Sequence, residues 1–295
     1  MNGKLRRSPA TGKSGPAQDL PPGLYVTATP IGNAADITLR ALKVLGSCDL
    51  IAAEDTRVTA KLLAIHGIVK PLTAYNDHNA ARERPKLLAK LRQGARIALV
   101  SDAGTPLISD PGFKLVREAV AEGLAVHAIP GTSAVLTGLA LAGLPTDRFL
   151  FAGFLPSRQG ERRSALEELK NIRATLVFFE SAQRLDASLA DMTAVFGVRT
   201  AAVARELTKL HEEVRRGLLS ELCAHYEKHG APKGEVTLII SPPHEVEADT
   251  GRIDSALDKA LAFMPTRAAV DLVAEMLEAP RRTVYERALG KKNDG

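Results

Sequence analysis

The sequence predicts an α/β protein of two such domains, because short apolar runs alternate with amphipathic stretches over most of its length. Five apolar runs precede residue 143, and each ends in a polar or glycine-containing turn. This strand–helix alternation is typical of a mostly parallel sheet covered by helices on both faces. Since parallel strands all end at one edge of their sheet, we expect the five turns to gather there.

The first α/β domain is predicted over residues 21–143. Its strands are expected at 24–29, 50–53, 72–75, 97–100 and 125–129. Five helices are expected between and after these strands: one at about 36–45, one after the second strand that ends at residue 67, one at 80–93, one at 111–122 and one that begins at about residue 134. Asp36 is expected to cap the first helix, and Gly94 to end the third. Asp110 and Pro111 are expected to begin the fourth.

The second α/β domain is predicted over residues 144–243, after a boundary at Gly143–Asp147. Its strands are expected at 148–155, 175–179, 200–204, 212–216 and 236–240. Helices are expected from the Arg-rich segment 158–163 to about 172, between the second and third of these strands, and at 218–229. Pro242 and Pro243 then interrupt the chain.

Both ends of the chain differ from the two domains. Residues 1–20 hold four basic residues among Gly, Ser and Pro without an apolar core, which excludes a signal peptide and predicts a flexible, disordered tail. An acidic linker precedes a helical region at 250–295, with helices at 266–277, capped by Thr266, and at 281–289. Two short helices in succession resemble a helix-turn-helix, and the second carries Arg281, Arg282 and Arg287. The alternative is a helical hairpin that only packs on the main body.

The composition restricts the class of protein. A net charge of +5 and a pI near 9.2 permit an anionic partner such as nucleic acid without requiring one. No stretch approaches the ~20 apolar residues that cross a bilayer. Cys48 and Cys223 lie far apart without metal-ligand spacing, so neither a disulfide framework nor a metal site is expected. These features predict a cytoplasmic protein.

Small residues dominate three turns, at 29–33, 101–106 and 130–134. The turn at 101–106 follows the central apolar strand and combines a carboxylate, two hydroxyls and a glycine. The alternative is an ordinary strand–helix turn whose Asp and Ser cap the helix. Because such loops let a ligand approach backbone N–H and C=O groups, we expect them to hold a polar, zwitterionic cofactor. Dinucleotide, P-loop, zinc-protease and hydrolase motifs do not occur.

Several motifs resemble the ribosomal RNA small-subunit methyltransferase I family, of the tetrapyrrole methylase superfamily. They are Leu24–Asn33, Ala53–Arg57, Ser101–Pro106, Gly143–Phe149, Gly153–Pro156, Ala204–Lys209 and Lys233–Glu235, and they follow the family's order. One departure is Pro130-Gly131-Thr132, where many relatives have Pro-Gly-Pro. The resemblance implies two α/β domains with S-adenosylmethionine in the cleft between them, and a homodimer. It also implies 2′-O-methylation of a cytidine ribose in 16S ribosomal RNA at the decoding site.

Transferred onto this sequence, the superfamily's cofactor contacts fall on Ile31, Asp102, Ala103, Gly104, Thr105, Ser133 and Ala134, with a second-domain wall of Phe179, Leu207 and Val236. Asp102 could hold a ribose hydroxyl or the ammonium group of the donor. Ser133 and the N–H groups of a helix start favour its carboxylate, although Ser133 could simply cap the helix.

The residues that assist methyl transfer remain open among side chains at the strand edge: Glu54, Asp55, Arg57, Asn76, His78, Arg205, Lys209 and Lys233. Asp55 and His78 could accept the proton of the hydroxyl, and Lys209 could stabilise developing negative charge. RNA contacts are expected at Arg57, Arg205, Arg281 and Arg282. Structural ion pairs, Glu54 with Arg57 and Arg205 with Glu206, are the alternative for these stretches. Other possible functions are a methylase of a small tetrapyrrole and a non-enzymatic protein that binds adenosylmethionine and RNA.

Overall fold

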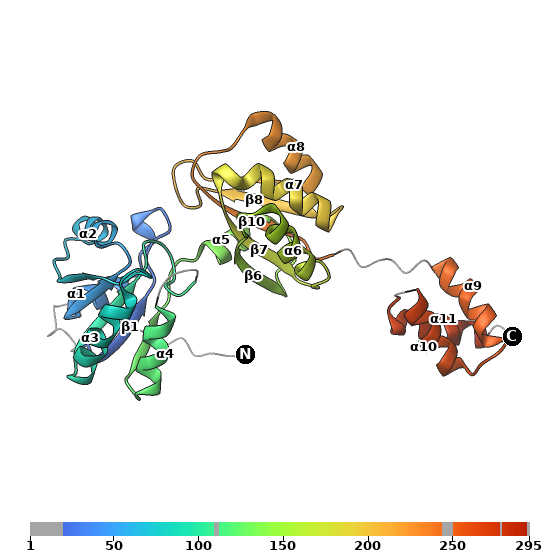
Figure 1. The fold of residues 1–295 in the computed structure, drawn as a ribbon, viewed down its shortest axis with the longest axis horizontal. Helices are drawn as coiled ribbons and strands as arrows, with labels where there is room; N and C mark the ends of the chain where they lie inside the picture. The colour runs from blue at the N-terminus through green and yellow to red at the C-terminus, as the bar shows by residue number, and fades with distance from the viewer. Residues whose placement is uncertain (1–19, 109–111, 244–249, 278, 294–295) are drawn as a thin grey trace, which may run out of the picture.

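The computed structural model describes residues 20–108, 112–243, 250–277 and 279–293. Over these ranges the chain forms two open sheets with their helices, followed by a group of C-terminal helices (Figure 1). The predicted tail up to Asp19, the helix start at Asp110 and Pro111, and the acidic linker residues lie outside the described residues.

The first sheet is entirely parallel, in the order β3-β2-β4-β1-β5. Its strands are β1 (Gly23–Thr27), β2 (Leu50–Ala53), β3 (Leu72–Ala74), β4 (Arg96–Val100) and β5 (Val126–Ile129). The helices between them are α1 (Leu39–Ser47), α2 (Thr56–Ile65), α3 (Ala80–Arg92) and α4 (Phe113–Ala121). The predicted alternation of strands and helices is therefore confirmed.

Helices cover both faces of this sheet. In β4, Ile97 and Leu99 pack with α3 and α4, whereas Ala98 and Val100 pack with α1 and α2. Side chains alternate between the faces of a strand, so a strand buried on both faces reads as one continuous apolar run. The neighbouring strands β1 and β4 lead into helices on opposite faces, which makes their junction a switch point of the sheet.

One predicted helix start is corrected. Asp36 does not cap α1, because Asn33 first caps a short 3₁₀ turn, η1 (Ala34–Asp36), and the chain then extends. The cap of α1 is Thr38, whose hydroxyl accepts a hydrogen bond of 3.1 Å from the N–H of Ala41. Helix α4 begins at Phe113, directly after Gly112, whose φ of +136° is accessible chiefly to glycine.

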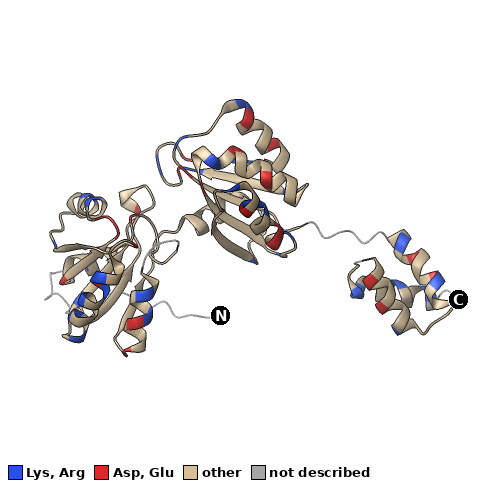
Figure 2. Cartoon of the chain, in the orientation of Figure 1, with Lys and Arg blue, Asp and Glu red and all other residues tan. Residues whose placement is uncertain are grey.

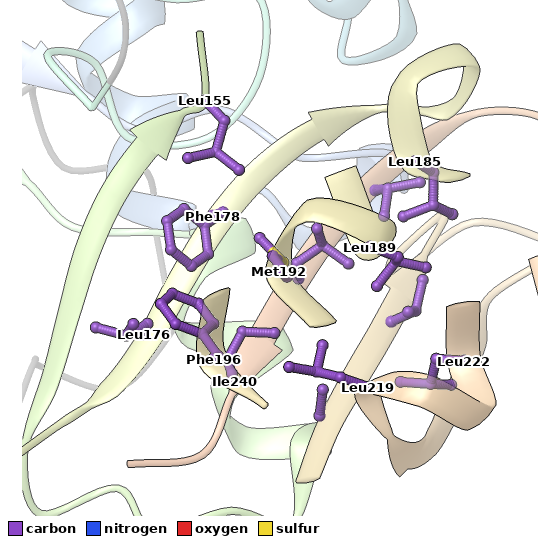
Figure 3. Packing of buried hydrophobic residues seen from close by; sticks show 14 of the residues in the cluster. Leu155, Leu176, Phe178, Leu185, Leu189, Met192, Phe196, Leu219, Leu222 and Ile240 are labelled. Atoms are coloured by element: carbon purple, nitrogen blue, oxygen red, sulfur yellow. The ribbon is translucent and has the colours of Figure 1, made fainter. Parts of the chain in front are cut away.

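The second sheet is mixed, in the order β6-β7-β10-β8-β9. Its strands are β6 (Phe149–Phe154), β7 (Thr175–Ser181), β8 (Thr200–Arg205), β9 (Glu213–Leu218) and β10 (Glu235–Ile240). Only the β6–β7 pair is parallel, and the other pairs are antiparallel. Three helices, α6 (Gln159–Leu169), α7 (Leu185–Phe196) and α8 (Leu219–His229), supply side chains to the main core, drawn in Figure 3.

Helix α5 (Ala134–Ala142) covers the other face of this second sheet. Its Val135 and Leu139 pack with Val177 of β7 and Ile239 of β10. In Figure 1 it lies at the junction of the two sheets. The helix thus precedes the predicted boundary at residue 143 in sequence but packs on the second sheet.

The C-terminal helices form a small core of their own. They are α9 (Thr250–Leu261), α10 (Thr266–Met276) and α11 (Arg281–Asn293). Helix α9 was not predicted, although Ile253, Leu257 and Ala260 have the spacing of a buried helix face. Thr266 is the first helical residue rather than the cap, because the extended Pro265 occupies the cap position. None of the helices in the described ranges has the length and apolar character needed to cross a membrane.

Candidate active site

Three loops at the carboxyl edge of the first sheet are bonded to one another. The backbone of Thr29, after β1, exchanges two hydrogen bonds with Gly104, after β4, of 2.9 and 3.1 Å. Thr132, after β5, donates its hydroxyl to the carbonyl of Thr29 and accepts a bond of 3.0 Å from the hydroxyl of Thr105. The predicted gathering of small-residue turns is thus confirmed, and Thr132 in place of proline adds a tie between the loops.

A cavity of about 430 Å³ lies between these loops and the second sheet. All ten side chains or backbone segments expected to bind the cofactor line it: Ile31, Asp102, Ala103, Gly104, Thr105, Ser133, Ala134, Phe179, Leu207 and Val236. Residues more than 200 positions apart in the sequence are therefore brought to one cavity by the fold.

The first domain supplies the polar side of the cavity. Asp102 accepts a hydrogen bond of 2.9 Å from the N–H of Asp55, and desolvation raises the pKa of its carboxyl despite this bond. Ser133 precedes α5, and its side chain makes no capping bond, so the expected alternative role as a helix cap is not observed. The first turn of α5 thus offers N–H groups to an anion at the cavity.

The second domain supplies an aromatic cluster to the cavity. The ring of Phe179 meets the rings of Phe151 and Phe154 edge to face, at centroid distances of 4.8 and 5.6 Å. Phe154 is 57% exposed and also lines the cavity. Sequence reasoning missed several lining residues: Ile108, Phe154, Glu180, Ser181, Ala182, Gln183, Gly234, Glu235 and Thr237. Only their position could have pointed to them, since most of them lie at the end of β7 or the start of β10. Glu54, one of the candidates at the strand edge, also lines the cavity.

The loop after β8 holds Lys209 in a network of carboxylates. Its ammonium lies 2.8 Å from Glu206 and 3.0 Å from Glu235. Burial alone lowers the pKa of Lys209, but the bonds to these carboxylates outweigh it and raise the pKa overall. Lys209 lines a separate cavity of about 270 Å³ beside Ile31. It is therefore a firmly charged group that cannot accept a proton.

Two motifs of the sequence are interlocked at this loop. Glu206 and Thr208 have φ values of +50° and +65°, which few non-glycine residues adopt. The strain is accommodated by bonds: Glu206 accepts from the N–H of Glu235 at 3.1 Å, and the N–H of Thr208 donates to Glu212 at 2.7 Å. A Cβ on Gly234 would lie 2.1 Å from the Glu206 carboxylate, so glycine is required there.

A second cavity, of about 420 Å³, opens beside the first at the ends of β2 and β3. It is lined by Glu54, Asp55, Thr56, Arg57, Ala74, Asn76, Asp77 and His78. Two of the three predicted catalytic residues, Asp55 and His78, lie here, whereas Lys209 does not. His78 is exposed to solvent.

Asp55 is engaged by its own helix. Its Oδ1 accepts from the N–H of Arg57 at 2.8 Å and caps α2, and the Arg57 guanidinium binds the same carboxylate. The bonds from Arg57 lower the pKa of Asp55 to about 2. A carboxylate with so low a pKa is a weak base at neutral pH.

Both expected ion pairs are corrected. Arg57 pairs with Asp55 rather than Glu54, since the capped turn brings Asp55 back toward it. Arg205 pairs with Glu213 at 3.1 Å across the β8–β9 ladder, because these two residues lie directly opposite. Glu206 binds Lys209 instead.

Arg281 and Arg282 lie at the start of α11, in the C-terminal group of helices. Arg281 pairs with Asp271 of α10, and Arg282 pairs with Glu286 one turn along its own helix. Their side chains are 56% and 90% exposed. Figure 2 shows basic and acidic residues interspersed along these helices.

The lining of the main cavity fits S-adenosylmethionine. Small residues leave backbone groups within reach, and a Cβ on Gly104 would lie 3.3 Å from the side chain of Ile31. A carboxylate at Asp102, a helix start at Ser133 and the aromatic wall at Phe179 match an ammonium group, a carboxylate and a purine. Within the described ranges, no group of three or more His, Cys, Asp or Glu residues could hold a metal ion.

The two-sheet fold is shared with other solved structures. Diphthine synthase aligns over 74% of this chain and 89% of its own, with a TM-score of 0.58 and 15% identity. A uroporphyrin-III C-methyl transferase from Thermus thermophilus, complexed with S-adenyl homocysteine, aligns over 74% of this chain and 97% of its own, with a TM-score of 0.53 and 17% identity. These likenesses show a shared two-sheet fold.

Family comparisons give the finer assignment. The family of Tetrapyrrole (Corrin/Porphyrin) Methylases matches residues 23–223, and the RsmI C-terminal HTH domain matches residues 247–292. A Ribosomal RNA small subunit methyltransferase I from Mesorhizobium japonicum is 49% identical over 94% of this chain and 95% of its own. The Escherichia coli O157:H7 protein of that name is 46% identical over 90% and 94%. The chain belongs to the tetrapyrrole methylases and, within them, to the ribosomal RNA small subunit methyltransferase I family.

Proposed function

We propose that this protein transfers a methyl group from S-adenosylmethionine to the ribose 2′-oxygen of a cytidine at the decoding site of small-subunit ribosomal RNA. The observation that carries this proposal is a pair of adjoining cavities, one matched to the cofactor and one open and polar, in a member of this family. When bound, the cofactor supplies an electrophilic methyl group on a sulfonium. The protein's task is then to align the hydroxyl with that group.

We assign the cofactor to the ten predicted residues of the main cavity. Asp102 and the first turn of α5 at Ser133 would hold its charged groups, and Thr105 and Gly104 would shape the loop around it. Phe179, Leu207 and Val236 would cover its apolar surface. Ile31, Ala103 and Ala134 keep the loops close without filling the cavity.

We assign the acceptor ribose and its phosphates to the second cavity. Arg57 is 86% exposed at this cavity and carries a charge that a phosphate can share. His78 could accept or donate a hydrogen bond to the ribose. Asp55 would position Arg57 and α2, and Lys209 would hold the loop that carries Leu207. Arg205, engaged by Glu213, would support that loop.

We propose that the C-terminal helices contact the RNA through Arg281 and Arg282. Removing residues 250–295 should weaken binding to small ribosomal subunits and leave cofactor affinity unchanged, because these helices have a core of their own and line none of the three cavities. Filter binding and calorimetry on the truncated chain measure the two affinities. Equal subunit affinity in both chains would leave these helices without an RNA role.

We also propose that the protein is a homodimer that acts in the cytoplasm, where small subunits are assembled. Exposed apolar side chains in the α/β body, including Phe113 at 63% and Leu136 at 56%, offer surface for a second copy. Light scattering on the purified chain measures the mass in solution, and a monomer mass across the micromolar range would contradict the dimer.

The deciding experiment is transfer of labelled methyl to small subunits from cells that lack this protein, followed by digestion and mass spectrometry of the nucleosides. A 2′-O-methylated cytidine is the expected product. Transfer to a tetrapyrrole but not to subunits would favour a small-molecule methylase. Tight cofactor binding without transfer to either would favour a binding protein.

A further inference from the structure

Glu54 lies where the two cavities meet. It follows β2 directly and is the residue that lines both the main cavity and the second cavity. Its backbone is fixed on two sides, because its N–H donates to Val100 at 3.2 Å and its carbonyl accepts from Asn76 at 3.3 Å. The side chain therefore occupies a defined place between the proposed cofactor and the proposed acceptor.

The carboxylate of Glu54 is half engaged. One oxygen, Oε2, accepts from the N–H of Asp102 at 3.2 Å. Within the described residues, no hydrogen bond engages Oε1, and no Lys or Arg pairs with the group. One oxygen thus fixes the carboxylate and the other is available to a ligand, which is the arrangement that a general base requires.

The alternatives for that role are weaker in the structure. Asp55 is bound by Arg57 and has a pKa of about 2, so it holds a proton poorly. Lys209 is a charged ammonium and lines neither of the two cavities that meet at Glu54. His78 lines the second cavity only.

We propose that Glu54 is the catalytic base that accepts the proton of the ribose 2′-hydroxyl, an inference that rests on the proposed function. As the 2′-oxygen forms its bond to the methyl carbon, the carbon–sulfur bond breaks and its electron pair stays on sulfur. The hydroxyl proton moves to Oε1 of Glu54, so atoms and charge balance. Solvent can take the proton from the carboxyl after the product leaves.

The surroundings of Glu54 adapt it to this task. Titratable and charged groups that face it from the packed elements are Asp55, Arg57, Asp77, His78 and Asp102 of the first domain and Glu180 and Glu235 of the second. Desolvation and the carboxylates of Asp102, Asp77 and Asp55 raise the pKa of Glu54, against the bond from the Asp102 N–H. A raised pKa makes the carboxylate a stronger base, and the rate should fall as the pH drops through that pKa.

The experiment measures single-turnover methyl transfer to small subunits across pH, at saturating cofactor and subunit, for the full chain and for Glu54→Gln. Glutamine keeps an oxygen for the N–H of Asp102 but cannot accept the proton. We expect the rate to fall about 10²–10⁴-fold and its acid limb to disappear. Glu122→Gln, a carboxylate that pairs with Arg92 away from the cavities, is the matched control and should keep both rate and limb.

Two further variants keep the proposal falsifiable. Glu54→Asp retains a carboxylate, so we expect part of the rate and an acid limb displaced to lower pH. A Glu54→Gln protein that binds cofactor, melts cooperatively and keeps the rate and the limb overturns the proposal. So does His78→Gln, if that change alone removes the limb. A wild-type chain that methylates no cytidine would instead refute the proposed function itself.

A readout independent of activity is the melting temperature without ligand. The pKa of Glu54 is raised in the folded state. We therefore expect the melting temperature of Glu54→Gln to increase relative to that of the wild type as the pH rises above the pKa of an ordinary glutamate. An equal difference at every pH would show that Glu54 has an ordinary pKa and would overturn its role as a base.

Discussion

The two sheets contribute different things to one cavity. The first sheet is entirely parallel and offers its edge, where the loops after β1, β4 and β5 carry Thr29, Asp102 and Ser133. The second sheet is largely antiparallel and offers the end of β7 and the start of β10, where Phe179 lies opposite Thr237 on the neighbouring strand.

Sheet geometry explains this division. Parallel strands all end at the same edge, so polar turn residues accumulate there without any long-range design of the sequence. Antiparallel strands end at alternate edges, so their ends do not gather in one place. What neighbouring antiparallel strands share is a face of the sheet, to which every second side chain points. The first domain therefore contributes to the site through the turns that follow its strands, whereas the second contributes largely through two neighbouring antiparallel strands, β7 and β10.

The largest expected effect separates the two faces of β7. Phe178 is fully buried among α6, α7 and α8 (Figure 3), whereas the adjacent Phe179 is only partly buried and lines the cavity. Phe178→Ala should lower the free energy of unfolding by about 3–5 kcal/mol. Phe179→Ala should cost less stability and weaken cofactor binding more. Urea unfolding and calorimetry on both variants test this, and equal effects on affinity would break the distinction between the faces.

An intermediate effect is expected at the edge of the first sheet. Asp102→Ala should weaken cofactor binding by about 10–100-fold, because a charge-assisted hydrogen bond contributes roughly 1.5–3 kcal/mol. Its cost in folding should be about 1.5–3 kcal/mol, the range for the hydrogen bond that the Asp55 N–H makes to this carboxylate. Calorimetric titration with the cofactor measures the change, with Glu122→Ala as the control. An unchanged dissociation constant would remove Asp102 from the site.

The smallest expected effect is a pH-dependent change in stability when Glu54 is replaced. Its folded-state pKa is raised, so the folded chain holds this proton more tightly than the unfolded chain. Stability is therefore greatest below the unfolded glutamate pKa and falls as the pH rises through the folded pKa. Glu54→Gln should remove that loss and stabilise the chain at neutral pH by less than about 1 kcal/mol, which is less than ~4 °C in Tm. Thermal melts from pH 4 to 8 measure it, and destabilisation at neutral pH would contradict it.

Particular elements show how far sequence reasoning reached. The strand at Ile97–Val100 was predictable because both faces of β4 are buried, which leaves an unbroken apolar run. The cap of α1 was not, since Asp36 and Thr38 are both good capping residues and only the 3₁₀ turn at Ala34 decides between them. Helix α9 was overlooked because its apolar spacing is short and adjoins the linker.

By itself, the sequence determined which residues end each strand, and hence the small-residue loops and the carboxylates within them. The reason is that the residues of a turn set its conformation locally. Only the tertiary structure decided which partner each charged group takes: Arg57 with Asp55, Arg205 with Glu213, Lys209 with Glu206 and Glu235. It also decided that Glu54 stands between two cavities. Pairing and desolvation depend on which elements are neighbours in space, and neighbours in space are set by strand order rather than by distance along the chain.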